Sequence, residues 1–378
     1  MLLLRRISAT TFLNFFVSGA ITLIIPLLLL ERNVSINEIG IVLSILPLVF
    51  LIARLLFAAI ADYIGWSHVF LLINWPTAMA STICYYFASS IFVFMLGKFA
   101  EGLRESAYWA VIRTGIYCLA GKNVEYEATK NNAIIWLASA AGAAAAGMLI
   151  AYAGFSITIA VIIFVSLVIF VPAVMLWKSC VESPLPKTTR LFTSLNPKGR
   201  TRMFWLVSLA LMFNSLAVYP TMTLLLPVFM DQELGYSYPV IGFLFMLFNI
   251  IAAAVTFITL KQPLNLKRAA FLTSISLIAS SFLAFSGVFF AGLFLALAFV
   301  RGYGIGFFEH IIVKAAKDSK NLSVDIGFLH APMRIAEFSS VLIAGFVVQF
   351  SGYGPLFVIT GICSGVYAFL SLRILKTQ

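Results

Sequence analysis

Residues 8–30 read SATTFLNFFVSGAITLIIPLLLL, an uncharged run of 23 residues between the basic pair Arg5 and Arg6 and the acidic Glu31. The hydrocarbon core of a bilayer requires about 20 apolar residues in an α-helix, so this run is long enough to cross a membrane. A signal peptide is the alternative, but the run is too long, lacks a small-residue cleavage site and precedes further apolar runs. We therefore interpret it as the first transmembrane helix.

Eleven more runs of similar length follow. They lie at about 38–61, 69–88, 90–116, 131–153, 156–177, 203–230, 238–260, 268–286, 288–314, 323–349 and 353–374. Two of the connections, Ala153–Gly154 and Ser351–Gly352, are so short that the helices they join must be antiparallel neighbours. The pattern predicts an all-α integral membrane protein with twelve transmembrane helices.

The composition excludes most soluble functions. Of the 378 residues, 62% are hydrophobic and 10% are charged, whereas a soluble protein carries about a quarter charged residues. The net charge of +11 comes from basic residues scattered between apolar runs, so there is no basic domain to bind nucleic acid. The four cysteines, Cys84, Cys118, Cys180 and Cys363, form no CxxC pair, which predicts reduced thiols and no metal site. Without a Walker loop or a catalytic triad pattern, we expect no cofactor, no ATP-driven transport and no enzyme activity.

The distribution of basic residues predicts the orientation. If the N-terminus is cytoplasmic, nearly all basic residues at helix ends fall on the cytoplasmic side, and the outer loops hold only Arg32, beside Glu31, Asp231 and Glu233. Lys and Arg are enriched in the cytoplasmic loops of membrane proteins. We expect a multi-pass plasma-membrane protein with both termini and residues 178–202 in the cytoplasm.

The chain contains an internal repeat with a period of about 200 residues. Three matches share a spacing of 200 positions: Asn14 with Asn214, Glu31 with Asp231, and residues 101–102 with 301–302. Two six-helix bundles, residues 1–177 and 203–378, joined by a cytoplasmic linker at 178–202, would explain this spacing. Parallel repeats of this kind characterise a transporter architecture whose site lies between the halves, near the bilayer midplane.

The most specific motif follows the second run. Residues 58–67 read AAIADYIGWS and resemble the Gly-x-x-x-Asp-basic-x-Gly-basic-basic pattern of the major facilitator superfamily. Asp62 and Gly65 match, Ala58 stands where the family has its first glycine, and the basic positions are not retained. The resemblance extends over essentially the whole chain. It implies the fold of that family, two pseudo-symmetric six-helix bundles, with Asp62 and Gly65 in a gating loop.

Two further helices resemble patterns of the same family. Lys98-x-x-Glu101-Gly102 resembles Arg-x-x-Gln-Gly, a segment implicated in proton transfer. Residues 138–147 resemble the antiporter pattern Gly-x-x-x-Gly-Pro-x-x-Gly-Gly, with alanine at some glycine positions and no proline. Small residues in a membrane helix also permit close packing, which is the alternative interpretation of this stretch.

Charged side chains inside the predicted helices indicate a polar cavity. Each costs about 2.5–3.5 kcal/mol on insertion scales, so such residues usually face an interior and mark function. Residues spaced three or four apart share a helix face, and the charged positions of the fourth helix fall within one arc. In the resembled fold, helices 1, 4, 7 and 10 line a central cavity. The residues expected to line it here are Asn14, Lys98, Tyr108, Trp109, Asn214, Arg301, Arg334 and Glu337.

Two carboxylates are candidates for proton coupling. Glu101 is the first choice and Glu105 the second, because a carboxylate at membrane depth can change protonation between transport states. Arg301 and Lys98 are the candidates to bind an anionic group or the deprotonated carboxylate. His310 falls on the side of its helix opposite Arg301, so we expect it to pack rather than face the cavity.

Each of these polar positions also has a structural interpretation. Lys98 with Glu101, and Arg334 with Glu337, are three residues apart and could neutralise each other. A salt bridge between Glu101 and Arg301 could serve gating alone. The paired asparagines suit interhelical hydrogen bonds as well as they suit a cavity.

The predicted function is secondary active transport of a small organic solute by alternating access. We expect a monomer whose partners are its substrate, protons and the lipid bilayer. The antiporter-like stretch favours proton-coupled efflux, and proton-coupled uptake of an organic anion or a sugar is the alternative. A membrane enzyme or a sensor on the same scaffold is the alternative class, which the lack of any loop longer than about 25 residues disfavours.

Overall fold

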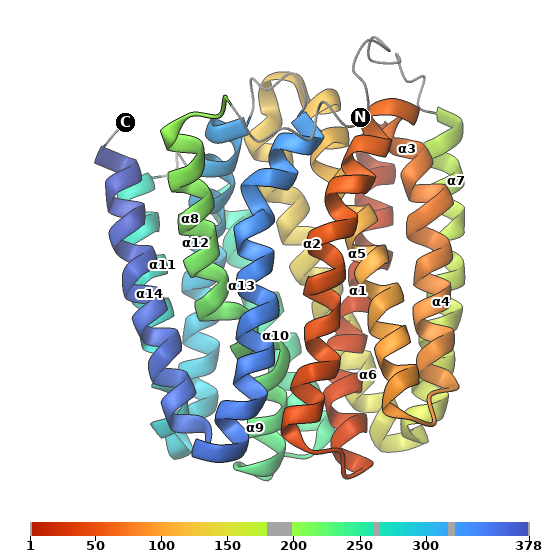
Figure 1. The fold of residues 1–378 in the computed structure, drawn as a ribbon, viewed down its shortest axis with the longest axis vertical. Coiled ribbons are helices and arrows are strands. Elements are labelled where there is room, and N and C mark those ends of the chain that lie inside the picture. The colour runs from red at the N-terminus through yellow and green to blue at the C-terminus, as the bar shows by residue number, and fades with distance from the viewer. Residues whose placement is uncertain (1, 180–198, 261–264, 281, 317–321, 377–378) are drawn as a thin grey trace.

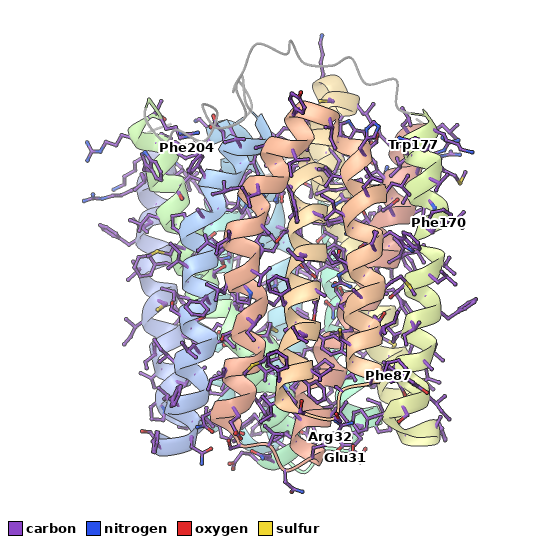
Figure 2. The ribbon with its side chains drawn as sticks, turned by 45° about the vertical axis from the view of Figure 1, so that its right-hand side comes forward. Glu31, Arg32, Phe87, Phe170, Trp177 and Phe204 are labelled. Atoms are coloured by element: carbon purple, nitrogen blue, oxygen red, sulfur yellow. The ribbon has the colours of Figure 1, made fainter. Side chains whose placement is uncertain are left out.

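The fold is described from a computed structural model covering residues 2–179, 199–260, 265–280, 282–316 and 322–376. Most of these residues are helical, and none of them lies in a β-strand. Figure 1 shows the long helices side by side along one axis, with both chain ends at the same end of the bundle. We name this the terminal end. The opposite, loop end carries Glu31 and Arg32 (Figure 2).

The helices in chain order are α1 (Leu2–Glu31), α2 (Ile36–Ile64), α3 (Trp66–Val69), the π-helical turn η1 (Phe70–Asn74), α4 (Trp75–Tyr86), α5 (Ile91–Ala120), η2 (Gly121–Asn123), α6 (Val124–Val168), α7 (Phe170–Ser179), α8 (Arg202–Pro220), the π-helical turn η3 (Thr221–Leu225), α9 (Leu226–Gln232), α10 (Tyr238–Thr259), α11 (Leu266–Ser280), η4 (Leu283–Phe285), η5 (Gly287–Phe289), α12 (Phe290–Ala316), α13 (Leu322–Ser351) and α14 (Tyr353–Lys376). The predicted all-α class is confirmed. Several helices extend past the apolar runs that predicted them, because polar residues continue the last turns outside the apolar window. Cys180 and most of the 178–202 linker lie outside the described residues.

Eight helical stretches of the described residues are long and apolar enough to cross a membrane. The longest, Ile91–Lys178, comprises 88 residues and contains three of the predicted runs. Two other runs form shorter helices, the 12-residue α4 and the 15-residue α11, which pack against α5 and α12 respectively. The described helices are therefore consistent with the twelve predicted spans.

Glycines allow the two tight turns that the sequence predicted. Gly154 has a φ of 77° and interrupts α6, and Gly352 has a φ of 75° between α13 and α14. Positive φ is accessible to glycine because it has no Cβ to clash with the backbone. Gly65, with a φ of 101°, ends α2 in the same way. Gly65, which was predicted to lie in a gating loop, thus has a conformational role, while the side chain of Asp62 lies outside the described part of the structure.

Two pairs of glycines bring distant parts of the chain into close contact. A Cβ built on Gly40 of α2 would lie 3.1 Å from the Cα of Gly345 in α13, and one built on Gly147 of α6 would lie 3.0 Å from the Cα of Gly242 in α10. Gly40 and Gly242 are 202 positions apart, and Gly147 and Gly345 are 198 apart, close to the period of the sequence repeat. The packing of α2 on α13 therefore has a counterpart in the packing of α6 on α10.

Replacing Gly242 by alanine is expected to destabilise the protein by about 1–3 kcal/mol, a typical effect of overpacking. The added Cβ would lie 2.9 Å from both the carbonyl oxygen of Ala143 and the Cα of Gly147. Gly365→Ala in α14 is the matched control, because nothing lies within 4 Å of its added Cβ. Thermal unfolding in detergent measures both variants. A Gly242→Ala protein as stable as the control would mean that α6 and α10 separate without loss of stability.

Apolar packing closes the loop end of the bundle. One continuous buried core joins helices from the two ends of the sequence, including Leu29 of α1, Val42 of α2, Met230 of α9, Ile241 of α10 and Val348 of α13. Each of these side chains is at most 6% exposed. The cavity described below is therefore separated from the loop end by a layer of packed side chains.

The outer surface carries large apolar side chains. Phe87, Phe170 and Trp177 are 71%, 42% and 40% exposed, and Figure 2 shows them on the outside of the bundle. Exposed aromatic residues over most of the helical surface would be unfavourable in water and suit contact with lipid. The arrangement agrees with the multi-pass membrane protein that the sequence predicts.

Candidate functional site

Two adjoining pockets lie between the helices, with volumes of about 260 and 360 Å³. We name them together the central cavity. The side chains that line both pockets are Trp109, Ile135, Trp136, Tyr219, Met222, Phe248 and Arg301. They come from α5, α6, α8, η3, α10 and α12, so both parts of the sequence repeat contribute to one cavity.

The charged residues of α5 form a compensated cluster on one wall of the cavity. The Nζ atom of Lys98 lies 2.8 Å from Oε2 of Glu101, and Nη2 of Arg104 lies 3.1 Å from Oε1 of Glu105. The hydroxyl of Tyr85 donates to Glu101 at 2.5 Å, and that of Ser18 donates to Glu105 at 2.8 Å. Two cations therefore balance two carboxylates. Glu101 pairs within its own helix and forms no salt bridge with Arg301.

The two carboxylates differ in access to the cavity. The side chain of Glu101 is 3% exposed, and that of Glu105 is 17% exposed. Glu101 also has a second cation, Arg104, at 3.9 Å, in addition to Lys98. Glu105 is therefore the less enclosed and less strongly paired of the two.

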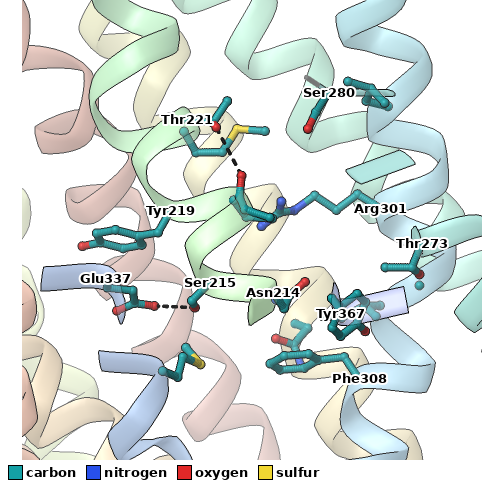
Figure 3. Close-up of a pocket in the computed structure, with 18 of the residues that line it drawn as sticks. Asn214, Ser215, Tyr219, Thr221, Thr273, Ser280, Arg301, Phe308, Glu337 and Tyr367 are labelled. Carbon is teal, nitrogen blue, oxygen red and sulfur yellow. Dashed lines mark hydrogen bonds between the residues drawn. The ribbon is translucent and has the colours of Figure 1, made fainter. Parts of the chain in front are cut away.

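A second ion pair lies on α13. Arg334 donates to Oε2 of Glu337, and Ser215 of α8 donates to Oε1 of the same carboxylate at 3.0 Å, as the dashed line in Figure 3 shows. The guanidinium of Arg334 lies over the ring of Phe50, 3.6 Å from its centroid. Arg334 and Glu337 both reach the lining of the cavity, so their i,i+3 pairing and their cavity position coexist.

Arg301 of α12 is a cation of the cavity lining that takes part in none of the ion pairs described so far. Its guanidinium lies over the ring of Trp136, 5.2 Å from the centroid, and it lines both pockets. Figure 3 shows its side chain extending from α12 across the pocket toward α8. Among the described residues it has no ion pair and no hydrogen-bond partner.

An ion pair between α5 and α12 lies on the side of the cavity nearer the terminal end. Nη2 of Arg113 lies 2.5 Å from Oε1 of Glu309, and Asn132 donates to the same oxygen at 2.9 Å. Glu309 is fully buried. The two residues are 196 positions apart, one helical turn from the period of the repeat. Because Arg113 and Glu309 carry opposite charges at nearly equivalent positions of the repeat, the sequence contained a signal for this ion pair. The sequence analysis did not use that signal.

Arg113→Lys is expected to lower the free energy of unfolding by about 1–2 kcal/mol, because lysine keeps the charge but loses the two-pronged contact with Glu309. The exposed Arg268→Lys serves as the control and should leave stability unchanged. The measurement is the melting temperature of both variants in detergent. Equal melting temperatures would show that the Arg113 contact does not stabilise this conformation.

Arg54 of α2 is a buried arginine whose guanidinium finds no hydrogen-bond partner in the described part of the chain. It is 2% exposed, and none of its three guanidinium nitrogens has a partner among the described residues. Its guanidinium lies 5.4 Å from the ring centroid of Phe50, the ring that also contacts Arg334. The charges that act on it most strongly are those of Arg334, Arg113 and Glu337. Two cations therefore share the neighbourhood of one carboxylate.

The residues predicted to line the cavity divide into two groups. Six of them line at least one of the two pockets: Lys98, Trp109, Asn214, Arg301, Arg334 and Glu337. The proton-coupling candidates Glu101 and Glu105 line the pocket of about 360 Å³ as well. Tyr108 and Asn14 line neither pocket. Tyr108 hydrogen-bonds Thr11 at 2.8 Å, and Asn14 donates to the carbonyl oxygen of Thr10. The phenol of Tyr108 therefore joins α5 to α1, whereas the amide of Asn14 donates within α1 and not to a second helix.

Other sequence-based expectations concern residues away from the cavity. Nδ1 of His310 lies 3.5 Å from Oε2 of Glu125, so its contact is with α6. The small residues of 138–147 are contact points: a Cβ on Gly142 would meet the carbonyl oxygen of Phe16 at 2.1 Å. No cluster of metal-ligating side chains occurs among the described residues.

Trp136 was not predicted as a residue of the cavity, although its ring contacts the guanidinium of Arg301. A single tryptophan in an apolar run has no sequence pattern that marks it as functional.

Comparison with known proteins gives matches of two kinds, to a protein family and to solved structures. The sequence profile described as Major Facilitator Superfamily matches residues 7–309. Among solved structures, that of the human organic anion transporter MFSD10 (TETRAN) has a TM-score of 0.73, with 17% sequence identity over 97% of this chain and 99% of that chain. At this identity the likeness establishes the fold alone. No curated protein matches the sequence.

Proposed function

Since the chain belongs to the Major Facilitator Superfamily and is thus a membrane transporter rather than an enzyme, we propose that it moves a small organic solute by proton-coupled alternating access. The observation that carries the proposal is the central cavity, which is enclosed by helices of both sequence repeats and lined by ionised side chains. Charged groups at membrane depth are retained where they bind cargo or ions. The chain encloses this cavity by itself, which supports action as a monomer.

The moving parts are two six-helix bundles, residues 1–177 and 203–378, joined by the linker at 178–202. The paired contacts of α2 with α13 and of α6 with α10 support this division, because each joins one bundle to the other. Rocking of the bundles would open the cavity at one end at a time. The apolar core at the loop end and the Arg113–Glu309 pair near the terminal end are the contacts that would break in turn.

In the proposed orientation the protein lies in the plasma membrane and its terminal end faces the cytoplasm. The excess of Lys and Arg at that end supports it. An impermeant maleimide added outside should label a cysteine introduced at Gln232 and leave one introduced at Ser183 unlabelled. The opposite labelling pattern would reverse the orientation.

Proton coupling is assigned to the carboxylates of α5. The geometry favours Glu105 over Glu101, because a proton-binding site must reach the water of the cavity and Glu105 is the more exposed of the two. Glu101 holds Lys98 and Arg104 in place through its salt bridges. In this assignment Glu105 binds and releases the proton, and Glu101 organises the charged wall.

The direction of transport has two candidates. The stretch 138–147 resembles antiporters and favours proton-coupled efflux, although its glycines also serve as packing contacts. Proton-coupled uptake of an organic anion is the second candidate, and it is favoured by Arg301 in the cavity, which has no ion pair among the described residues. The sign of proton coupling separates them, because an antiporter exchanges cargo for protons and a symporter carries both together.

The test begins with a thermal-shift screen of metabolites and drugs on the purified protein. A stabilising solute is then followed across proteoliposome membranes with an imposed pH gradient of either sign. Accumulation that depends on the gradient supports the proposal, and its sign gives the direction. Stabilisation without any flux would instead support a sensor, and overturn the transport proposal.

A further inference from the structure

The charged side chains that line the central cavity, together with their ion-pair partners, carry one more positive than negative charge. On α5, Lys98 and Arg104 pair with Glu101 and Glu105. On α13, Arg334 pairs with Glu337, leaving the Arg301 charge without a carboxylate among the described residues. A guanidinium at membrane depth without a counter-charge is unfavourable, so a ligand that supplies one would be bound strongly.

The groups around Arg301 are suited to an anionic head. Trp136, which lies under the guanidinium, has an indole nitrogen with no hydrogen-bond partner among the described residues. Asn214 and Tyr219 face the same pocket in Figure 3. An arginine fork matches a carboxylate or sulfonate in a bidentate manner, and nearby N–H and O–H groups add further donors. The site therefore offers donors and a positive charge to one end of a ligand.

The rest of the cavity is suited to a flat apolar body. Its walls include the aromatic side chains of Trp109, Trp136, Tyr219, Phe248 and Phe308. Aromatic faces pack well against planar ligands. A sugar would leave the Arg301 charge uncompensated, and an organic cation would be repelled by it.

We propose that the cargo is a small amphipathic organic anion with a planar, aromatic body, whose acidic group is bound by Arg301. This inference rests on the proposed function, since it names the substrate class of the same cavity. The charge of Arg301 would select the anion over neutral and cationic molecules of the same shape, and the face of Trp136 would orient the guanidinium.

The test uses three probes that share one ring system and differ in charge: 2-naphthoate, neutral 2-naphthamide and cationic 2-naphthylmethylammonium. Binding to the purified protein is measured by calorimetry and by quenching of tryptophan fluorescence. We expect 2-naphthoate to bind at least tenfold more tightly than the amide, a difference of about 1.4 kcal/mol. Arg301→Gln should remove this preference, and Arg301→Lys should retain part of it.

Lys267→Gln is the matched control, because it removes an exposed positive charge outside the cavity and should keep the full preference. Equal affinity for the three probes, a preference that survives in Arg301→Gln, or no binding of 2-naphthoate would overturn the inference. Flux of the same probes in proteoliposomes keeps the two proposals distinguishable. Arg301-dependent binding without flux would overturn the transport proposal but support the anion site. Flux without preference for the anion would support transport and overturn the anion site.

Discussion

Glu105→Gln is expected to abolish proton-driven accumulation of the cargo in proteoliposomes, while exchange of cargo down its own gradient continues. Glutamine keeps the shape of glutamate and can still accept the hydrogen bond from Ser18, but it cannot bind and release a proton. Uptake should then stop at equilibration, whatever the pH gradient. The measurement is solute flux with and without an imposed gradient, in vesicles of equal protein content.

Glu101→Gln is the comparison variant. It leaves Lys98 with no carboxylate partner, so we expect a less stable protein that retains proton coupling in the folded fraction. Loss of coupling in Glu101→Gln and full coupling in Glu105→Gln would move the proton site one turn along α5. Full coupling in both variants would remove α5 from the proton path.

The proton site also predicts how pH changes the binding of an anion. The charged and titratable groups around Glu105 are Lys98, Glu101, Arg104, Tyr108, Tyr219, Arg301, Arg334 and Glu337. Protonation of Glu105 removes one negative charge from this set, so affinity for an anion bound at Arg301 should rise as the pH falls. Such positive linkage favours movement of the anion and the proton in the same direction. The Glu105→Gln variant should lose this dependence.

Glu337→Gln is expected to lower the free energy of unfolding by about 3–5 kcal/mol, the range typical of removing one partner of a buried ion pair. Glu337 is 2% exposed and is the carboxylate that faces both Arg334 and Arg54. Its neutralisation would leave two buried guanidinium groups without a counter-charge. Glu127→Gln, which removes the partly exposed partner of Lys130, should cost about 0–1 kcal/mol and serves as the control.

Arg54→Met provides the reciprocal test of the same cluster. Because none of the Arg54 nitrogens has a hydrogen-bond partner among the described residues, methionine should raise the melting temperature of the otherwise unchanged protein. In the Glu337→Gln background it should recover part of the lost stability, since one of the two unpaired charges is gone. A melting temperature that falls in both backgrounds would show that Arg54 makes a favourable interaction in the folded state.

The amino-acid sequence by itself determined the class of the protein and the positions of its helices. Apolar runs of bilayer length predict membrane helices because a spanning segment must satisfy its backbone hydrogen bonds internally. Glycines at Gly154 and Gly352 marked tight turns, because positive φ is open to residues without a Cβ. Charged positions on α5 were also visible, since Lys98 and Glu101 are neighbours on one helix face whatever surrounds that helix.

Only the tertiary structure decided which distant side chains meet. Helical periodicity gives the face on which a residue lies but not the helix that faces it, so periodicity alone does not pair Arg113 with Glu309 across 196 positions. For the same reason the sequence allowed a Glu101–Arg301 bridge, whereas the structure pairs Glu101 with Lys98 and leaves Arg301 over Trp136. Arg301 can be identified as an unpaired charge only when all of its spatial neighbours are known. Those neighbours belong to helices distributed along the whole chain.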